Sequence, residues 1–147
     1  MQPRDIEKYL HEKIPLTKAM KVKVETYDAD RLVLTAPLSA NYNHLGTAFG
    51  GSLNTLAILA GYALLWLELG DASAHVVIRE SSVRFRRPVR GELRAVCRRP
   101  SDEVLDAFRE KYSKEHKARI TLQAVLEENG ETAVEFEGVY VAVQGAA

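Results

Sequence analysis

The stretch that decides the fold is a polar loop that runs directly into an apolar segment. It reads Asn41-Tyr42-Asn43-His44-Leu45-Gly46-Thr47-Ala48-Phe49-Gly50-Gly51-Ser52-Leu53-Asn54, and the apolar segment extends over residues 53–69. The pattern predicts one long helix that begins near Gly51 and ends at Gly70. A helix that is apolar nearly all round must be buried on more than one side. The rest of the chain, helped by a second subunit, must therefore wrap around it.

Alternating apolar and polar residues predict that the wrapping surface is an antiparallel sheet. Asn129-Gly130 is a strong hairpin signal between the last two strands. Two further helices are expected over residues 4–13 and 101–113, the second capped by Ser101. We therefore expect one α+β domain over residues 1–147, a curved six-stranded sheet around one central helix. Its strands are expected over residues 20–27, 31–38, 76–88, 92–99, 118–127 and 131–144.

Composition narrows the class of protein. The 147 residues include 20 basic and 20 acidic side chains, so net charge favours neither nucleic acid nor an anionic membrane as a partner. The apolar segment is shorter than the roughly 20 residues that span a bilayer and contains Asn54 and Glu68. The single cysteine, Cys97, lies in a strand-like run and is typical of a core residue in a cytoplasmic protein. The four histidines show no metal-binding spacing, so no metal is expected.

The start of the predicted central helix is the candidate site. Free backbone N–H groups there, with the positive end of the helix dipole, suit an anionic oxygen. The N–H of Gly51 or Ser52 would form an oxyanion hole, and Asn43 would orient a water or close the loop as an Asx turn. His44 could act as a general base, or only form a hydrogen bond. Asn54 is a further polar candidate.

Other residues are candidates for holding a substrate. Ser52 and Thr55 share one helix face, and their alternative role is helix capping or bonding to backbone carbonyls. A local basic cluster later in the chain could bind phosphate, or could be a solvated strand face. The substrate-binding set is Gly46, Thr47, Phe49, Gly50, Thr55, Arg84, Arg86 and Arg87.

These motifs, in this order, resemble the hotdog-fold thioesterases. The family's Asn-x-x-Gly-x-x-His-Gly-Gly loop is matched at Asn43, Gly46, Gly50 and Gly51, with Phe49 where many members have His. Residues 83–91, Val-Arg-Phe-Arg-Arg-Pro-Val-Arg-Gly, are similar to a strand and turn that commonly lie near the coenzyme A nucleotide. Asn-His-x-Gly-Thr-x-Phe-Gly-Gly-Ser at 43–52 and Lys-Ala-Arg-Ile at 117–120 resemble the YiiD-type C-terminal thioesterase domain in particular.

The resemblance implies a hotdog fold and hydrolysis of acyl-CoA or acyl-carrier-protein thioesters, with no cofactor apart from the coenzyme A of the substrate. It also implies a homodimer, or a dimer of dimers, with sites between subunits. One departure concerns the carboxylate that many members carry two and a half turns into the helix, where this chain has Ile58. No carboxylate occurs between Asp30 and Glu68. A binding module that holds an acyl thioester without hydrolysing it is therefore the competing hypothesis, and a hydratase or dehydratase of the same fold is a third.

Overall fold

The computed structural model describes residues 2–145, so residues 1, 146 and 147 of the predicted domain lie outside the described residues. Four α-helices are α1 (Pro3–Lys13), α2 (Pro15–Met20), α3 (Gly50–Leu69) and α4 (Asp102–Glu115), and a 3-10 helix spans Leu38–Ala40. Six strands are β1 (Lys23–Tyr27), β2 (Arg31–Ala36), β3 (Ala74–Phe85), β4 (Leu93–Arg98), β5 (Lys117–Glu128) and β6 (Glu131–Gln144).

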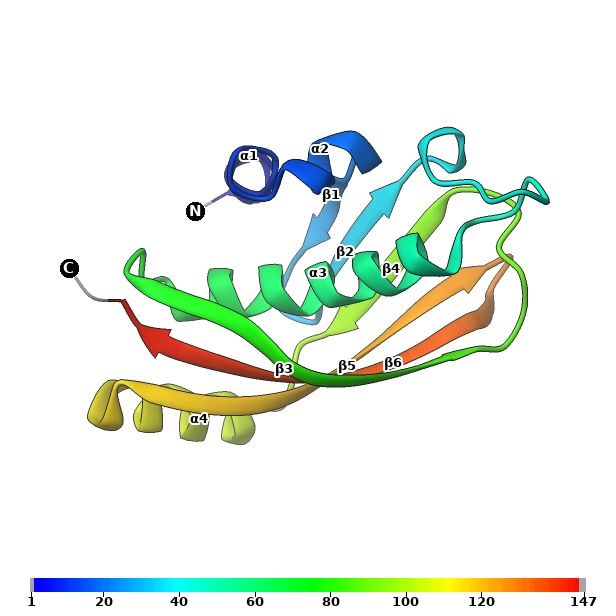
Figure 1. Cartoon of the computed structure of the whole chain (residues 1–147). Coiled ribbons are helices and arrows are strands. Elements are labelled where there is room, and N and C mark those ends of the chain that lie inside the picture. The colour runs from blue at the N-terminus through cyan, green and yellow to red at the C-terminus, as the bar shows by residue number, and fades with distance from the viewer. Residues whose placement is uncertain (1, 146–147) are drawn as a thin grey trace.

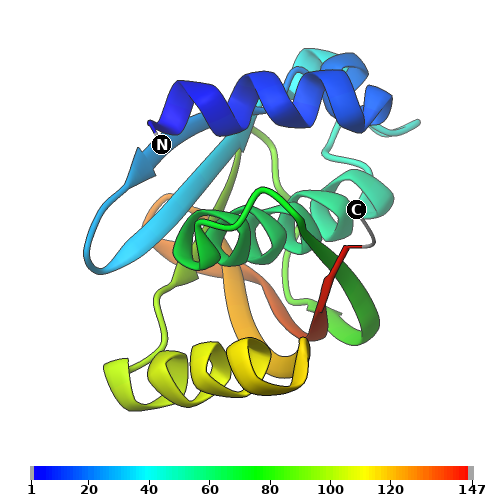
Figure 2. The ribbon, with the colours of Figure 1, turned by 90° about the vertical axis from the view of Figure 1, so that its left-hand side faces the viewer.

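The strands form one antiparallel sheet in the order β1-β2-β4-β5-β6-β3. Figures 1 and 2 show the sheet curling around α3, with α1 and α2 on one side and α4 on the other. The predicted architecture of a curved six-stranded sheet around one long helix is confirmed. The predicted hairpin at Asn129-Gly130 is also confirmed: these two residues join β5 to β6, and both have the positive φ that a two-residue hairpin of this type requires.

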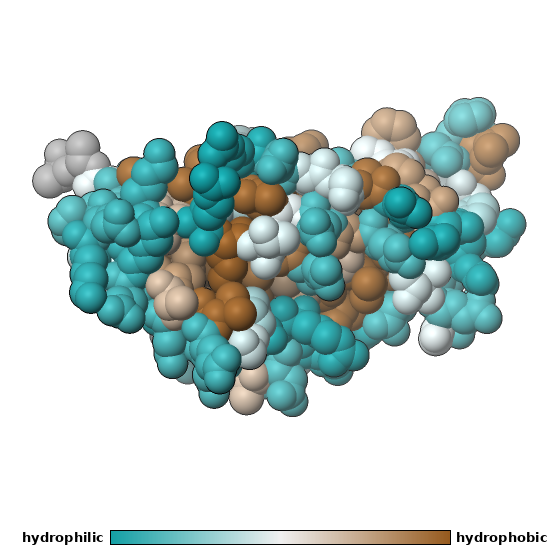
Figure 3. Space-filling model, turned by 90° about the horizontal axis from the view of Figure 1, so that it is seen from below, coloured by the Kyte–Doolittle hydropathy of each residue, from teal (hydrophilic) through white to brown (hydrophobic). Residues whose placement is uncertain are grey.

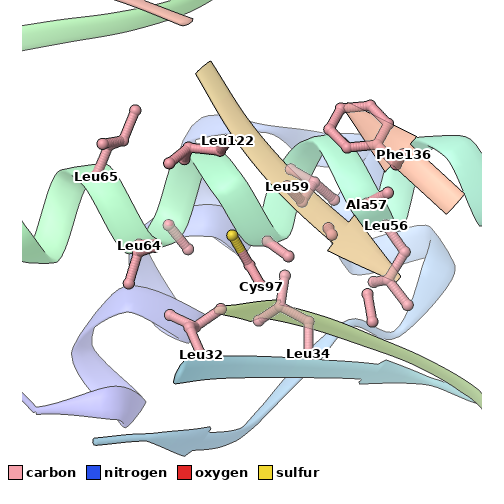
Figure 4. Close-up of a cluster of buried hydrophobic side chains, with 14 of the residues drawn as sticks. Leu32, Leu34, Leu56, Ala57, Leu59, Leu64, Leu65, Cys97, Leu122 and Phe136 are labelled. Carbon is pink, nitrogen blue, oxygen red and sulfur yellow. The ribbon is translucent and has the colours of Figure 1, made fainter. Parts of the chain in front are cut away.

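The core lies between α3 and the concave face of the sheet. Ten of the 20 residues of α3 are buried, all of them between Leu53 and Trp66, so the apolar segment is a core helix of the fold. Figure 4 shows side chains from four strands meeting it: Leu32, Leu34, Cys97, Leu122 and Phe136. Burial raises the pKa of the Cys97 thiol to about 12, as expected for a core residue.

One stripe of α3 is only partly covered. It starts at Gly51 and continues through Thr55, Ile58 and Tyr62, positions that share a helix face. Helix α1 closes the far end, where Tyr9 stacks on Trp66 with ring centroids 4.6 Å apart. The Tyr62 hydroxyl also donates to the Tyr9 hydroxyl across 3.3 Å. The stripe therefore runs from the glycine pair to an aromatic cluster.

Strand β3 forms one edge of the sheet and carries exposed apolar side chains, with Val77 55% and Phe85 52% exposed. A long edge strand presents unpaired backbone groups that favour pairing with another chain. Seen from below, the molecule shows an apolar area in the middle of the face, surrounded by hydrophilic residues (Figure 3).

Several predicted boundaries are wrong, among them the end of the second strand, which lies at Ala36 and not at residue 38. The predicted first strand includes Met20, which instead ends α2, a short helix begun by Pro15 at its first position. The predicted third strand extends to Pro88, but β3 ends at Phe85 because the N–H groups of Arg86 and Arg87 both turn to the carbonyl of Ala133. Helix α4 continues two residues further than predicted, to Glu115.

Candidate functional site

The loop before α3 is closed by the side chain of Asn43. Its Oδ1 accepts hydrogen bonds from the N–H groups of Leu45 (2.9 Å) and Thr47 (3.2 Å), and its Nδ2 donates to Thr47 Oγ1 (3.0 Å). The backbone of Asn43 also donates to the Thr47 carbonyl at 2.7 Å. Both ends of the carboxamide are thus engaged inside the loop, which is the Asx-turn arrangement.

Asn41 anchors the loop, a role that sequence reasoning missed. The residue is 3% exposed, and its Nδ2 donates to the carbonyls of Met20 (3.0 Å) and Pro37 (2.9 Å). Its own carbonyl accepts the N–H of Phe49 at 2.8 Å, directly before α3. A further hydrogen bond runs from the N–H of Ala48 to the carbonyl of Val89, also at 2.8 Å. These bonds fix where α3 begins.

The first turn of α3 presents three free donors. Phe49 occupies the N-cap position in an extended conformation and no side chain caps the helix. Within residues 2–145 the N–H groups of Gly50, Gly51 and Ser52 donate no hydrogen bond, and the first bonded donor is Leu53, to the Phe49 carbonyl at 3.1 Å. Uncapped N–H groups at the positive end of a 20-residue helix favour a negatively charged oxygen.

Polar side chains beside these donors also lack partners in the described part of the chain. Ser52, Asn54 and Thr55 are half-buried, and none forms a side-chain hydrogen bond within residues 2–145, so the structure shows neither capping nor back-bonding by Ser52 or Thr55. Asn54 Oδ1 is buried without a donor. A buried acceptor left unpaired costs about 1–3 kcal/mol, so a hydrogen bond to this atom would be favourable.

Two aromatic rings flank the glycine pair. The Phe49 ring lies over Gly51, where a Cβ would overlap it, and the Phe85 ring lies 3.7 Å from where a Gly50 Cβ would stand. Both rings are more than half exposed. Gly51 therefore leaves room for the Phe49 ring at the mouth of the site, whereas a Cβ at Gly50 would be in ordinary contact with the Phe85 ring. Phe49 was a sequence candidate, whereas Phe85 was not.

The remaining loop candidates are at the surface. His44 is exposed and forms no hydrogen bond within the described residues, and Gly46 adopts a φ of +81°, which explains the glycine. Neither residue is tied to the start of α3 by a bond. Their proposed roles stay predictions.

The basic cluster that was expected to bind phosphate is largely paired with carboxylates. Arg86 donates two hydrogen bonds to Glu135, at 3.0 and 3.1 Å, and these bonds lower the pKa of that carboxyl. Arg87 forms an ion pair with Glu131. Arg84 stands opposite Glu135 in the strand register. The counter-charges reduce the positive field that this cluster offers to a ligand.

No carboxylate lies on the exposed stripe of α3. The one acidic residue of the helix is Glu68 at its far end, where its side chain binds Arg99 (3.1 Å), Arg109 (2.6 Å) and the Tyr27 hydroxyl (2.5 Å). The position that resembles the family carboxylate is Ile58, whose backbone carbonyl accepts a hydrogen bond from Tyr140. Among residues 2–145, no three His, Cys, Asp or Glu side chains cluster as a metal site would require.

Comparison with known proteins places this geometry in a family. The sequence profile described as "Putative thioesterase (yiiD_Cterm)" matches residues 3–144. A crystal structure of a protein of unknown function from Chlorobaculum tepidum TLS is similar at 32% identity, with a TM-score of 0.87 and 97% of each chain covered. A "putative thioesterase" from Shewanella oneidensis is similar at 26% identity (TM-score 0.83, 96% of each chain). A "Probable Thioesterase" from Pseudomonas aeruginosa is similar at 28% identity (TM-score 0.82, 97% of each chain).

Proposed function

Because the chain belongs to the YiiD_C family of thioesterases and has their hotdog fold, we propose that it hydrolyses an acyl thioester of coenzyme A or of an acyl carrier protein. The observation that carries the proposal is the start of α3. Three N–H groups without acceptors stand there beside the unpaired side chains of Ser52, Asn54 and Thr55. This is a set of donors suited to a carbonyl oxygen that gains negative charge.

The proposed reaction is an attack of water on the thioester carbon. The carbonyl oxygen becomes an oxyanion held by the N–H groups of Gly51 and Ser52 at the helix start. The C–S bond then breaks, the leaving thiolate takes up the proton that the attacking water has lost, and the other product is a carboxylic acid. Removing one donor of such a hole typically costs about 2.7–4 kcal/mol of barrier. The helix dipole adds to the field at the same point.

The attacking water is assigned to Asn54 in preference to Asn43. The carboxamide of Asn43 already makes its bonds inside the loop, whereas Asn54 Oδ1 is buried and unpaired one turn beyond Gly50. An amide oxygen can accept a hydrogen bond from water and so orient it, but is a weak base. Glu68 is too distant for this role, since 17 residues of helix separate it from Gly51 by about 25 Å.

The acyl chain would follow the partly covered stripe of α3. That stripe passes Thr55 and Ile58 and ends at Tyr62, against the ring of Tyr9. From Gly51 to Tyr62 the helix rises about 16 Å, which is room for a medium-length chain. We expect Tyr62→Ala to shift the preferred substrate toward longer acyl chains.

We also propose that the functional unit is a homodimer. Strand β3 is an unpaired edge with exposed Val77 and Phe85, and the stripe of α3 needs cover that residues 2–145 of one chain do not supply. A second copy paired along β3 would supply it. Each site would then combine the 43–54 loop of one chain with the helix or strands of its partner. A monomer at micromolar concentration in sedimentation velocity would contradict this assembly.

The test is release of free thiol from a panel of acyl-CoA and acyl-carrier-protein thioesters, measured for wild type, Ser52→Pro and Ser52→Ala. Proline at 52 removes one N–H that has no helical acceptor, and Gly51 before it has no Cβ for the ring to meet. Alanine keeps the N–H and removes the hydroxyl. We expect kcat of the proline variant to fall about 10²–10³-fold below that of the alanine variant. Substrate binding with no turnover on any thioester would instead favour the non-catalytic binding module.

A further inference from the structure

A hollow of about 320 Å³ lies where the end of α4 meets the start of β5 and the first half of β3. Four cationic side chains line it, together with one carboxylate, Glu115. The cations come from three separate elements and are Arg79, Lys111, Lys117 and Arg119. In a chain with zero net charge, this is a local concentration of positive charge.

These four cations differ from the arginines near the end of β3. Within residues 2–145, none of the four forms an ion pair or a side-chain hydrogen bond, although all four are exposed. Arg86 and Arg87, by contrast, are bound to Glu135 and Glu131. Unpaired like charges repel each other and strengthen the field that an anion meets. The hollow is therefore the better anion site of the two.

The backbone explains why these side chains converge. Lys117 and Arg119 alternate along β5 and so leave the sheet on the same face. Arg119 stands opposite Val141 on β6, and Val141 stands opposite Val77 on β3. Arg79 lies where the pairing of β3 with β6 shifts register, between Ile78 and Glu80. Lys111 comes from the last turns of α4. The long stems of these side chains let their charged ends reach a common ligand.

We propose that this hollow binds a small anionic ligand that carries two or more phosphate groups, of the kind found in a nucleotide or at the nucleotide end of coenzyme A. Arginine binds phosphate through paired N–H groups and lysine binds it as a compact charge. The volume is at the lower end of the range for small-molecule sites, which favours a compact ligand over an acidic protein surface. The apolar Val141 in the lining suits the base or ribose of such a ligand.

The site is separate from the proposed reaction centre of the same chain. The elements that line the hollow, the end of α4 and the starts of β5 and β3, lie toward the C-terminal end of α3 (Figure 1). The glycine pair is at the N-terminal end of this 20-residue helix, which spans about 30 Å. Binding at the hollow therefore does not depend on thioester hydrolysis. Ser52→Pro is expected to keep it, so a failed hydrolysis assay and a failed binding assay remain distinguishable.

The experiment is calorimetric titration with adenosine 3′,5′-bisphosphate, ADP, inorganic diphosphate and coenzyme A, at low and at physiological ionic strength. We expect saturable binding that weakens with salt. The double variant Lys117→Gln with Arg119→Gln should weaken it about tenfold or more, since each lost charge-assisted hydrogen bond is worth roughly that factor. The charge-matched control is Lys8→Gln with Lys13→Gln on α1, which should change it by less than about twofold.

The outcomes also identify the source of the phosphates. Tighter binding of adenosine 3′,5′-bisphosphate and coenzyme A than of ADP assigns the hollow to the nucleotide end of coenzyme A, and equal binding of ADP and diphosphate assigns it to phosphate groups in general. The proposal is overturned if no probe saturates at low ionic strength, or if Arg84→Gln with Arg86→Gln abolishes binding while the β5 variant does not. Binding of poly-glutamate but of no phosphate would also overturn it, in favour of an acidic protein partner.

Discussion

The Tyr140 hydroxyl on β6 donates a 2.7 Å hydrogen bond to the backbone carbonyl of Ile58, in the middle of α3. Tyr140 is 1% exposed, so the bond is made inside the core. It is possible because residue 61, one turn along the helix, is glycine: a Cβ there would overlap the Tyr140 ring and hydroxyl. A side chain from a strand thus fixes the position of α3 at Ile58, a residue of the partly covered stripe that is proposed to hold the acyl chain.

Gly61→Ala should therefore destabilise the fold. Alanine is favoured over glycine by up to about 1 kcal/mol in a helix interior, but overpacking a core costs typically 1–3 kcal/mol, and the clash with a buried tyrosine decides the sign. The measurement is urea unfolding. Gly50→Ala is the control, because its Cβ would meet only Phe85, at an ordinary 3.7 Å. Equal stability of the two variants would show that Tyr140 gives way without cost.

Glu68 should be worth more to stability than the exposed acids near it. Its side chain is 7% exposed and bonds to Arg99, Arg109 and Tyr27, joining α3 to α4 and β1. Glu68→Ala is expected to lower the free energy of unfolding by about 3 kcal/mol, the low end for a broken buried pair, because both arginines are partly exposed.

The matched control for Glu68 is Asp106→Ala, which removes a 75% exposed partner of Arg109 at 3.5 Å. An exposed ion pair of this kind is worth about 0–1 kcal/mol. Equivalent losses in the two variants would mean that the network around Glu68 adds nothing beyond a surface pair.

Alkaline pH should weaken the fold through its buried tyrosines. Burial is the largest cause that raises the pKa of Tyr140, and it also raises the pKa of Tyr112 to about 12, from an ordinary 10. The folded state then holds phenolic protons that the unfolded state has lost, so stability is full below pH 10 and falls as pH rises through the folded pKa values.

Tyr140→Phe should lower stability by about 1 kcal/mol at neutral pH, through the lost bond to Ile58. It should also make the loss above pH 10 shallower, by up to about 1.4 kcal/mol per pH unit. The measurement is urea unfolding at a series of alkaline pH values, with Tyr42→Phe as the control because that ring is 64% exposed. The same slope in wild type and Tyr140→Phe would contradict the assignment.

The fold was predictable because two strong local signals agreed. The apolar run after Gly50 predicts a buried helix, and the alternation in β5 predicts a strand with one buried face. The errors lie where backbone bonds outweigh side-chain pattern. Helix α2 interrupts the alternation around Met20, and the end of β3 is set by two N–H groups that share one carbonyl, which no side-chain pattern reveals.

The local geometry of the candidate site was predictable in part. The glycine pair before an apolar helix correctly located the free N–H groups. Sequence alone left Asn43 open between a turn and a catalytic role, because an Asx turn and a water-orienting amide need the same residue type. Phe85 and Asn41 could not be placed at the site, since their contacts join segments 35 and 21 residues apart, Gly50 with Phe85 and Met20 with Asn41.

Asn43→Ala should act mainly on stability. It removes the acceptor of two loop N–H groups, of Leu45 and Thr47, and leaves the loop half-buried without its closing bonds. We expect a loss of about 1–2 kcal/mol in the free energy of unfolding. The kcat of the protein that remains folded should fall only to the extent that the altered loop displaces the start of α3. Thermal unfolding and thiol release on the same preparations measure both effects. A large loss of kcat with an unchanged melting temperature would return Asn43 to the catalytic role first considered for it.

Asn54→Ala should show the opposite pattern, and it is the sharper test of the mechanism. Asn54 Oδ1 is a buried acceptor without a partner, so its removal relieves a desolvated polar group and should leave stability unchanged or slightly higher. If this oxygen orients the attacking water, kcat and kcat/KM should fall together by about 10²-fold, because the interaction is made only as the transition state forms.

Asn54→Asp keeps the acceptor and adds a base next to the helix N-terminus, and should recover part of the loss with a rate that rises as the carboxyl ionises. Thr55→Ala, its neighbour on the stripe, controls for a general loosening of the pocket and should alter KM more than kcat. Full turnover in Asn54→Ala would exclude the amide from the reaction, and the water would then have to be held by the loop side chain of His44 or by the Ser52 hydroxyl.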